Sequence, residues 1–114
     1  MAKYERFLSG NFDELLDWVH GDITNGSFSA SYEDGSDVTM GTIRLAVRVY
    51  ERYSMAGGNR VSLNVTLAGD GDKLFVSGIT SGGSKAVFLK INTIGEDTFL
   101  DEFSGSVENY ISRH

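Results

Sequence analysis

Two long runs of alternating hydrophobic and polar residues dominate the middle of the chain, at residues 42–54 and 60–68. Their apolar positions recur at every second residue: Ile43, Leu45, Val47, Val49 and Tyr53, then Val61, Leu63, Val65 and Leu67. A period of two is typical of strands that are buried on one side. The turn-forming segment 55–59 joins the runs, so the pattern predicts a β-hairpin with an apolar inner face and a polar outer face.

The polar face of this hairpin carries the candidate ligand site. Arg44, Arg48 and Arg52 share one side of the first strand, and Ser62 and Asn64 are expected on the same side of the second. Guanidinium groups among hydroxyl and amide groups can bind a carboxylate or phosphate, because each guanidinium offers a bidentate fork. The alternative is an ordinary solvated sheet face on which the arginines pair with nearby acids.

Helical spacing of apolar residues appears near both ends of the chain. The first helix is expected from Asn11, which caps its first turn together with Glu14, to about Gly26. The second is expected from about Gly95, with acidic residues in its first turn, toward the C-terminus. One helical phase continues across Gly105 through these residues: Phe99, Phe103, Val107, Tyr110 and Ile111.

Shorter strand patterns fill the rest of the chain. They lie at residues 3–8, 27–32, 73–80 and 86–91, with a turn-forming cluster at 33–37. The order predicts a single α+β domain over residues 1–114, a two-layer sandwich. An antiparallel meander of about five or six strands is covered on one face by an N-terminal and a C-terminal helix. The order is similar to the helix-grip arrangement, which is an analogy of fold alone.

Composition narrows the function without naming it. The chain has 114 residues, no cysteine and a net charge of −6, which disfavours duplex nucleic acid as a partner. It lacks an apolar signal-peptide core and any run of about 18 apolar residues, so we expect a cytoplasmic protein without membrane insertion. No cofactor or metal site is expected, because Asp70 and Asp72 fit a hairpin turn and the Gly-rich segment 80–85 lacks P-loop spacing. His20 has no convincing metal partner.

Several segments resemble those of a family of small uncharacterised bacterial proteins, mostly from Gram-positive bacteria. The resembling segments are Val-Arg-Val-Tyr-Glu-Arg-Tyr from residue 47, Gly-Gly-Asn-Arg-Val-Ser-Leu-Asn-Val-Thr-Leu from residue 57, and Ile-Thr-Ser-Gly-Gly-Ser from residue 79. The resemblance runs through nearly the whole chain and implies a cytoplasmic protein of unknown function. It supplies no catalytic residue.

Two functional hypotheses follow from the residues. The first is a non-enzymatic binding module for a small anionic or amphipathic ligand, held against the arginine face or between the sheet and the C-terminal helix. The second is a homodimeric protein-interaction module that buries the outer sheet face, or the apolar strand at residues 74–79, against a partner. An enzyme ranks last, because no nucleophile can be matched with a base from the sequence.

Overall fold

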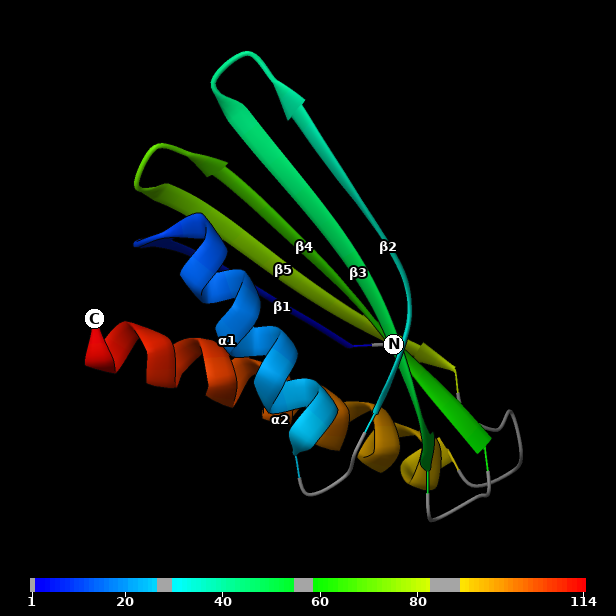
Figure 1. Ribbon diagram of the computed structural model, residues 1–114. Coiled ribbons are helices and arrows are strands. Elements are labelled where there is room, and N and C mark those ends of the chain that lie inside the picture. The colour runs from blue at the N-terminus through cyan, green and yellow to red at the C-terminus, as the bar shows by residue number, and fades with distance from the viewer. Residues whose placement is uncertain (1, 27–29, 55–58, 83–88) are drawn as a thin grey trace.

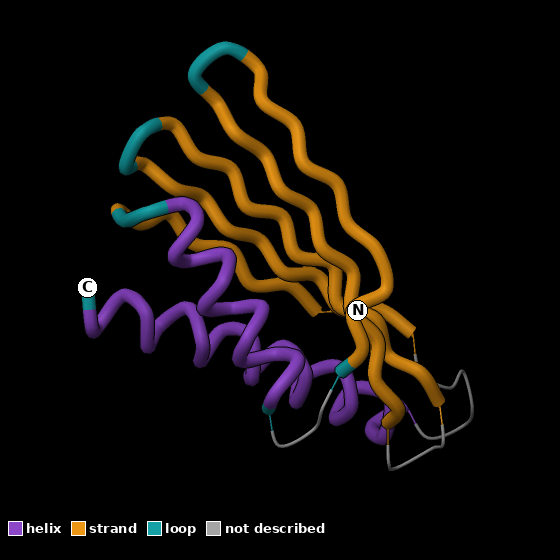
Figure 2. The backbone as a smooth tube through the Cα atoms, in the orientation of Figure 1, coloured by secondary structure: helices purple, strands orange, loops and turns teal. Residues whose placement is uncertain are grey.

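The computed structural model describes residues 2–26, 30–54, 59–82 and 89–114 of the chain. Over these residues it confirms the predicted α+β class, with a five-stranded antiparallel sheet and both helices on one face of it (Figures 1 and 2). The elements in chain order are β1 (Ala2–Ser9), α1 (Phe12–Asn25), β2 (Ser31–Met40), β3 (Ile43–Ser54), β4 (Asn59–Asp70), β5 (Lys73–Gly82) and α2 (Leu89–Arg113).

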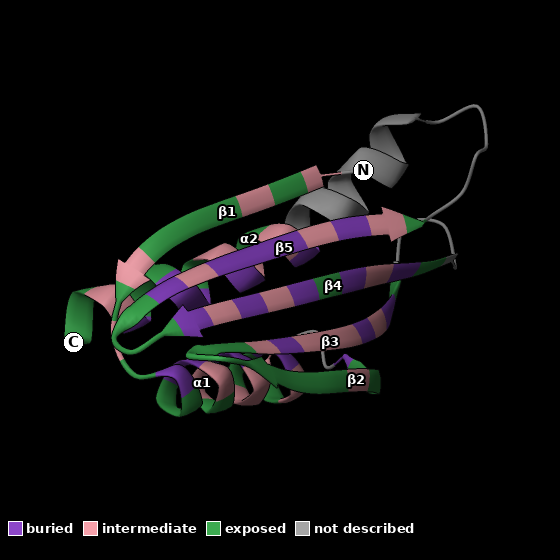
Figure 3. Ribbon diagram, turned by 90° about the horizontal axis from the view of Figure 1, so that it is seen from above, coloured by how far each residue is buried: buried purple, intermediate pink, exposed green. Residues whose placement is uncertain are grey.

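The sheet is a meander completed by its first strand. Strands β2 to β5 pair with one another in chain order, and β1 pairs antiparallel with β5, which gives the order β1-β5-β4-β3-β2. Helix α2 packs on β5, β1 and β4, while α1 packs on α2 and β4. Buried and more exposed positions alternate along β4 (Figure 3). The core therefore lies between the helices and the central strands.

Helix α1 begins where the sequence predicts. The side chain of Asn11 accepts a hydrogen bond from the backbone N–H of Glu14 at 2.9 Å, which confirms the cap. The backbone N–H of Asn11 donates to the Tyr110 hydroxyl at 3.1 Å, and that hydroxyl donates to the Glu14 carboxylate at 3.2 Å. A hydroxyl of α2 thus completes the capping box that Glu14 was expected to complete alone.

Helix α2 is longer than predicted. It includes Leu89 and runs through Gly105 to Arg113 as one helix, and the predicted apolar face is buried at Phe99 and Phe103. The strand predicted at 86–91 is therefore wrong over its last three residues, and 86–88 lie outside the described residues. The physical reason is that a short apolar run fits a strand and a buried helical segment equally well.

Strand β2 passes through the cluster at 33–37 that was predicted to form a turn, so that prediction is wrong. The strand ends instead at the turn containing Gly41, whose φ is +62°. A β-bulge between Tyr32 and Asp34 absorbs the irregularity. Pairing with β3 thus outweighs the local turn preference of these residues. Of the positions expected to point inward, Ala30 is buried, Tyr32 is 47% exposed, and 28 lies outside the described residues.

The largest correction concerns which face of β3 meets the helices. The register pairs Arg48 with Val65 and Tyr50 with Leu63, and directly paired residues of an antiparallel ladder point to the same side. Because Val65 and Leu63 are buried beneath the helices, the arginines of β3 face the helices as well. The predicted exposed arginine face is therefore wrong. The opposite, outward side of β3 carries Ile43, Leu45, Val47, Val49 and Tyr53.

The parity of the hairpin connection explains this correction. Ser54 pairs with Asn59, so four residues separate the paired ends. An even number sets even positions of β3 opposite odd positions of β4. A slip of one residue would move every side chain to the other face. The alternation within β3 cannot decide the matter by itself, because Ala46 and Tyr50 interleave with the arginines and supply that side with buried surface too.

Candidate functional site

Arg44 is held by the first turn of α1. Its guanidinium donates to both carboxylate oxygens of Asp13, at 3.1 and 2.9 Å, and lies 4.2 Å from the centre of the Phe12 ring. These hydrogen bonds hold the pKa of the Asp13 carboxyl below its usual range. The fork that a carboxylate ligand would use is thus occupied by an acid of the chain itself.

Arg48 is anchored to its own sheet. One of its guanidinium nitrogens donates to both oxygens of Asp37, at 3.0 and 3.2 Å, and the other donates to the carbonyl of Val47 at 2.9 Å. Only 16% of the Arg48 side chain is exposed. Arg48 therefore ties β2 to β3, and little of its side chain is left exposed to a ligand.

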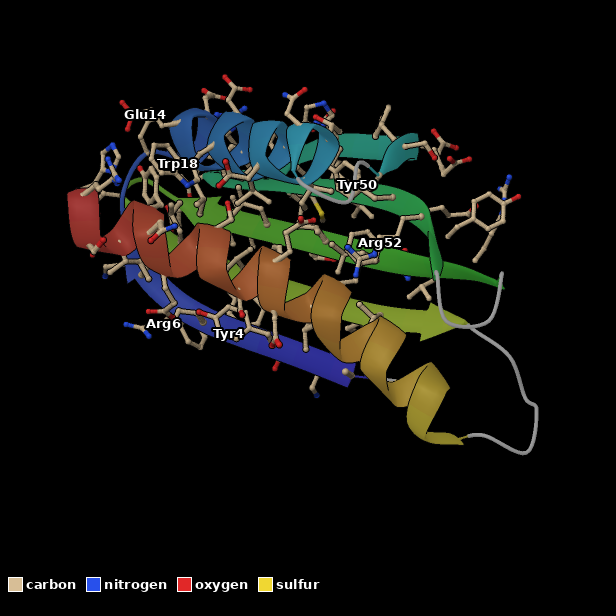
Figure 4. The ribbon with its side chains drawn as sticks, turned by 90° about the horizontal axis from the view of Figure 1, so that it is seen from below. Tyr4, Arg6, Glu14, Trp18, Tyr50 and Arg52 are labelled. Carbon is tan, nitrogen blue, oxygen red and sulfur yellow. The ribbon has the colours of Figure 1, made fainter. Side chains whose placement is uncertain are left out.

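Arg52 lies deepest of the three, on the side of β3 that faces α2 (Figure 4). Its guanidinium is 4.5 Å from the centre of the Phe99 ring, a cation–π arrangement. Burial lowers the pKa of the Arg52 guanidinium, and the nearby Glu102 charge partly offsets that effect. Burial likewise raises the pKa of the Glu102 carboxyl, against the opposing charge of Arg52. Arg52 is buried and Glu102 is half-buried, so the pair lies between the sheet and α2.

Ser62 and Asn64 lie on the opposite face of the sheet from the arginines. Asn64 pairs with Val49, and the Ser62 hydroxyl is 2.8 Å from the Ser81 hydroxyl on β5. The structure therefore separates the predicted site into two groups on two faces. Arg44, Arg48 and Arg52 share the helix side, while Ser62 and Asn64 share the open side.

The sequence did not predict a cluster of aromatic side chains that lies on the helix side. Nδ1 of His20 and the Tyr50 hydroxyl are 2.8 Å apart, and the Tyr32 ring packs edge-on against His20. Burial raises the pKa of the Tyr50 hydroxyl to about 12. The helical phase of α1 could have indicated that His20 faces the sheet, but its tyrosine partners depend on the β2–β3 register.

A surface hollow of about 320 Å³ lies beside Arg44, at the end of the sheet where α1 begins. Its lining is Gly10, Asn11, Phe12, Asp13, Thr42, Arg44, Gly69, Gly71 and Asp72. The volume is near the lower limit of small-molecule pockets. Within the described ranges, no three His, Asp or Glu side chains are grouped so as to hold a metal ion.

The face of the sheet away from the helices, here called the open face, carries a row of apolar residues across all five strands. The pairing registers place the members of this apolar row side by side in the order Phe7, Phe75, Ala68, Leu45, Val38. The rings of Phe7 and Phe75 lie 4.7 Å apart. Met40 and Ile43 extend the apolar surface toward the β2–β3 turn.

Much of this surface is exposed. Phe7 is 79% exposed, Met40 69% and Val38 49%. Both helices lie on the other side of the sheet, and no described element covers the open face (Figures 1 and 3). Large exposed apolar patches are uncommon on monomeric proteins and mark interaction sites. The sequence pointed to an outer-face interface, but it assigned Leu45 and its neighbours to the core.

Comparisons with known proteins leave the chemistry open. The profile of a family described as "Family of unknown function (DUF6054)" matches residues 1–111. No curated protein matches the chain. Among solved structures, it is similar to the crystal structure of TTHA0849 from Thermus thermophilus, with 7% sequence identity, a TM-score of 0.40, and coverage of 98% of this chain and 97% of that one. No helix in the described part of the chain is long and apolar enough to span a membrane.

Proposed function

We propose that this chain, which belongs to DUF6054, a family of unknown function, is a non-enzymatic protein-interaction module that pairs with a second copy of itself through the open face. The observation that carries the proposal is the apolar row, which crosses all five strands without a covering element in the described structure. Burial of such a row removes apolar surface from water and stabilises the assembly.

The size of the open face supports a second copy as the occupant. Five strands spaced about 4.8 Å apart and about ten residues long form a face of roughly 24 by 33 Å, or about 800 Å². A standard protein–protein interface buries about 800 Å² on each partner. One sheet stacked on another copy of the same sheet therefore reaches the size of a stable interface, and face-to-face packing of sheets is a common arrangement.

The charge of the open face also favours self-association. The chain carries a net charge of −6, so two copies repel each other in most orientations. At its paired strand positions the open face carries three basic and four acidic residues: Lys3, Arg60, Lys73, Glu5, Asp34, Glu51 and Asp70. That face is close to neutral, and two copies can approach through it with little repulsion.

Sedimentation velocity over about 1 to 500 μM tests the proposal, since this range covers typical weak and moderate dimers. We expect the wild-type protein to form a dimer. Leu45→Glu, which places a charge within the apolar row, should be a monomer with an unchanged circular dichroism spectrum. Asn109→Glu adds the same charge to an exposed position of α2 and should remain dimeric. A wild-type protein that stays monomeric throughout would refute the proposal.

A second candidate function rests on the hollow beside Arg44. A small ligand with a carboxylate or phosphate could take the place of Asp13 on the Arg44 fork, next to the N-terminus of α1. Native mass spectrometry of protein purified from cells separates the two candidates. A retained small mass that is lost in Arg44→Gln supports the ligand site, whereas a dimer without added mass supports the interaction module.

A further inference from the structure

Two rows of the open face carry apolar or oppositely charged residues at equal distances on the two sides of β4. We infer that two copies pair around a two-fold axis that runs parallel to the strands over β4, with Lys3 of each copy opposite Asp34 of the other. This inference rests on the proposed function and adds the register of the interface. Strand β4 is the central strand of the order β1-β5-β4-β3-β2, so rotation about this axis exchanges β1 with β2 and β5 with β3.

The apolar row fits this rotation. Phe75 comes to lie over Leu45 of the second copy, and Phe7 over Val38, so each aromatic ring meets an aliphatic side chain. Ala68 meets Ala68 at the axis. The small side chain at the centre lets the sheets approach closely there, while the larger flanking residues interdigitate at the usual sheet separation of about 10 Å.

Another row of the open face supplies charge complementarity. Farther from the β4–β5 turn than the apolar row, the paired residues across the sheet are Lys3, Ile79, Asn64, Val49 and Asp34. The rotation places Ile79 over Val49 and repeats the Lys3–Asp34 pair on both sides of the axis. The row has a base at one end and an acid at the other, so it is complementary to its own reverse and not to a copy in the same direction.

An axis along the apolar row is the competing arrangement, and it fits less well. A single row, the one containing Lys73 and Asp70, lies between the apolar row and the turn at Gly71. Rotation about the apolar row would therefore cover a narrow band of the sheet and leave the row of Lys3 and Asp34 without a partner surface. The strand-parallel axis superposes the whole of both faces, and greater apolar burial favours it.

Cross-linking distinguishes the two axes, because the chain has no cysteine of its own. In Ala68→Cys the thiols of the two copies lie beside each other under either axis, and a short bismaleimide should link them. In Val38→Cys the thiols lie about 19 Å apart under the strand-parallel axis, two strand spacings on each side of β4, and should not be linked. Efficient linking of Val38→Cys would overturn the proposed axis.

A charge swap tests the pairing itself by sedimentation equilibrium. Lys3→Glu and Asp34→Lys each place like charges opposite each other twice per dimer, and each should weaken dimerisation about tenfold. The double variant should return to within about threefold of the wild type. Arg113→Glu, an equal charge change at an exposed end of α2, should have little effect.

The outcomes separate the two proposals. If the wild type is monomeric, self-association and this register both fail. If Leu45→Glu abolishes the dimer while the Lys3 and Asp34 variants do not weaken it, the open face is the interface and the register is wrong. Failure of the double variant to recover would equally overturn the Lys3–Asp34 pairing.

Discussion

Charged and apolar side chains have opposite surroundings on the two faces of this sheet. On the helix side, Arg44 and Arg52 lie over aromatic rings of the two helices, and Tyr50 meets His20 of α1. On the open side, Phe7 and Leu45 belong to a row that no described element covers. Polar residue type therefore does not mark the solvent side of a strand. On the helix side, the helices supply carboxylates and aromatic rings to the arginines and a histidine to the Tyr50 hydroxyl. The open face keeps apolar surface that a protein partner can cover.

The sharpest test of the comparison removes one leucine from each face. Leu63 is fully buried under the helices, and Leu63→Ala should lower the free energy of unfolding by about 2–5 kcal/mol through lost burial and a cavity. Leu45→Ala removes a half-buried side chain of the open face and should cost the monomer less than about 1 kcal/mol. Urea denaturation at a concentration where the protein is monomeric measures both. Equal losses would show that the open face is packed like the core.

A smaller effect tests how closely α2 sits on the sheet. Gly78 of β5 lies beneath Phe103, and a Cβ at that position would overlap the Phe103 ring. Because Phe103 is fully buried, it has little room to move, and Gly78→Ala should cost about 1–3 kcal/mol. Gly105 on α2 has open space around its missing Cβ, so Gly105→Ala should be neutral or stabilising by up to about 1 kcal/mol. Thermal unfolding of both variants checks the pair, and a tolerated Gly78→Ala would contradict this packing.

The sequence predicted most of the fold because its strong signals are local. The Asn11 cap, the apolar phase through Phe103 and Val107, and the period-two runs of the central hairpin each identify an element from neighbours along the chain. Consecutive strands joined by short connections, together with two amphipathic helices, then leave few architectures other than a covered antiparallel sheet.

The site could not be predicted in the same way, because it depends on pairing between strands. A change of one residue in the β3–β4 register would pair Arg48 with Asn64 instead of Val65. That single change decides which face of the sheet the arginines occupy. The apolar row is harder still to predict from the sequence, because Phe7 and Val38 are connected only through the pairing of three intervening strands. The run at 33–37 shows the same limit, because pairing with β3 keeps turn-forming residues in a strand.

A pH effect sharpens the contrast on the helix side. Burial raises the pKa of the Tyr50 hydroxyl to about 12 from its ordinary value near 10. The folded protein thus holds a proton that the unfolded chain releases, so the stability from this group is intact below about pH 10 and is lost as pH rises toward 12. We expect Tyr50→Phe to lack an alkaline loss on the order of 1–2 kcal/mol, measured by urea denaturation across this pH range. Tyr53→Phe, at a position on the open face that is 61% exposed, leaves the Tyr50 hydroxyl in place and should retain that loss. Identical alkaline profiles for wild type and Tyr50→Phe would contradict the burial of this hydroxyl.

The smallest expected effect concerns Arg44 at the rim of the helix side. Hydrogen bonds from Arg44 depress the pKa of Asp13, so the pair stabilises the fold above the ordinary carboxyl pKa and loses that contribution as pH falls through the depressed value. In Arg44→Gln the pKa of Asp13, followed by NMR, should rise toward its ordinary value. Arg48→Gln is the matched control, because Arg48 binds Asp37 and should leave Asp13 unchanged. An Asp13 pKa that does not move in Arg44→Gln would mean that the guanidinium is free in solution. The hollow beside Arg44 would then be open to an anion, and the two faces of the sheet would compete as binding surfaces.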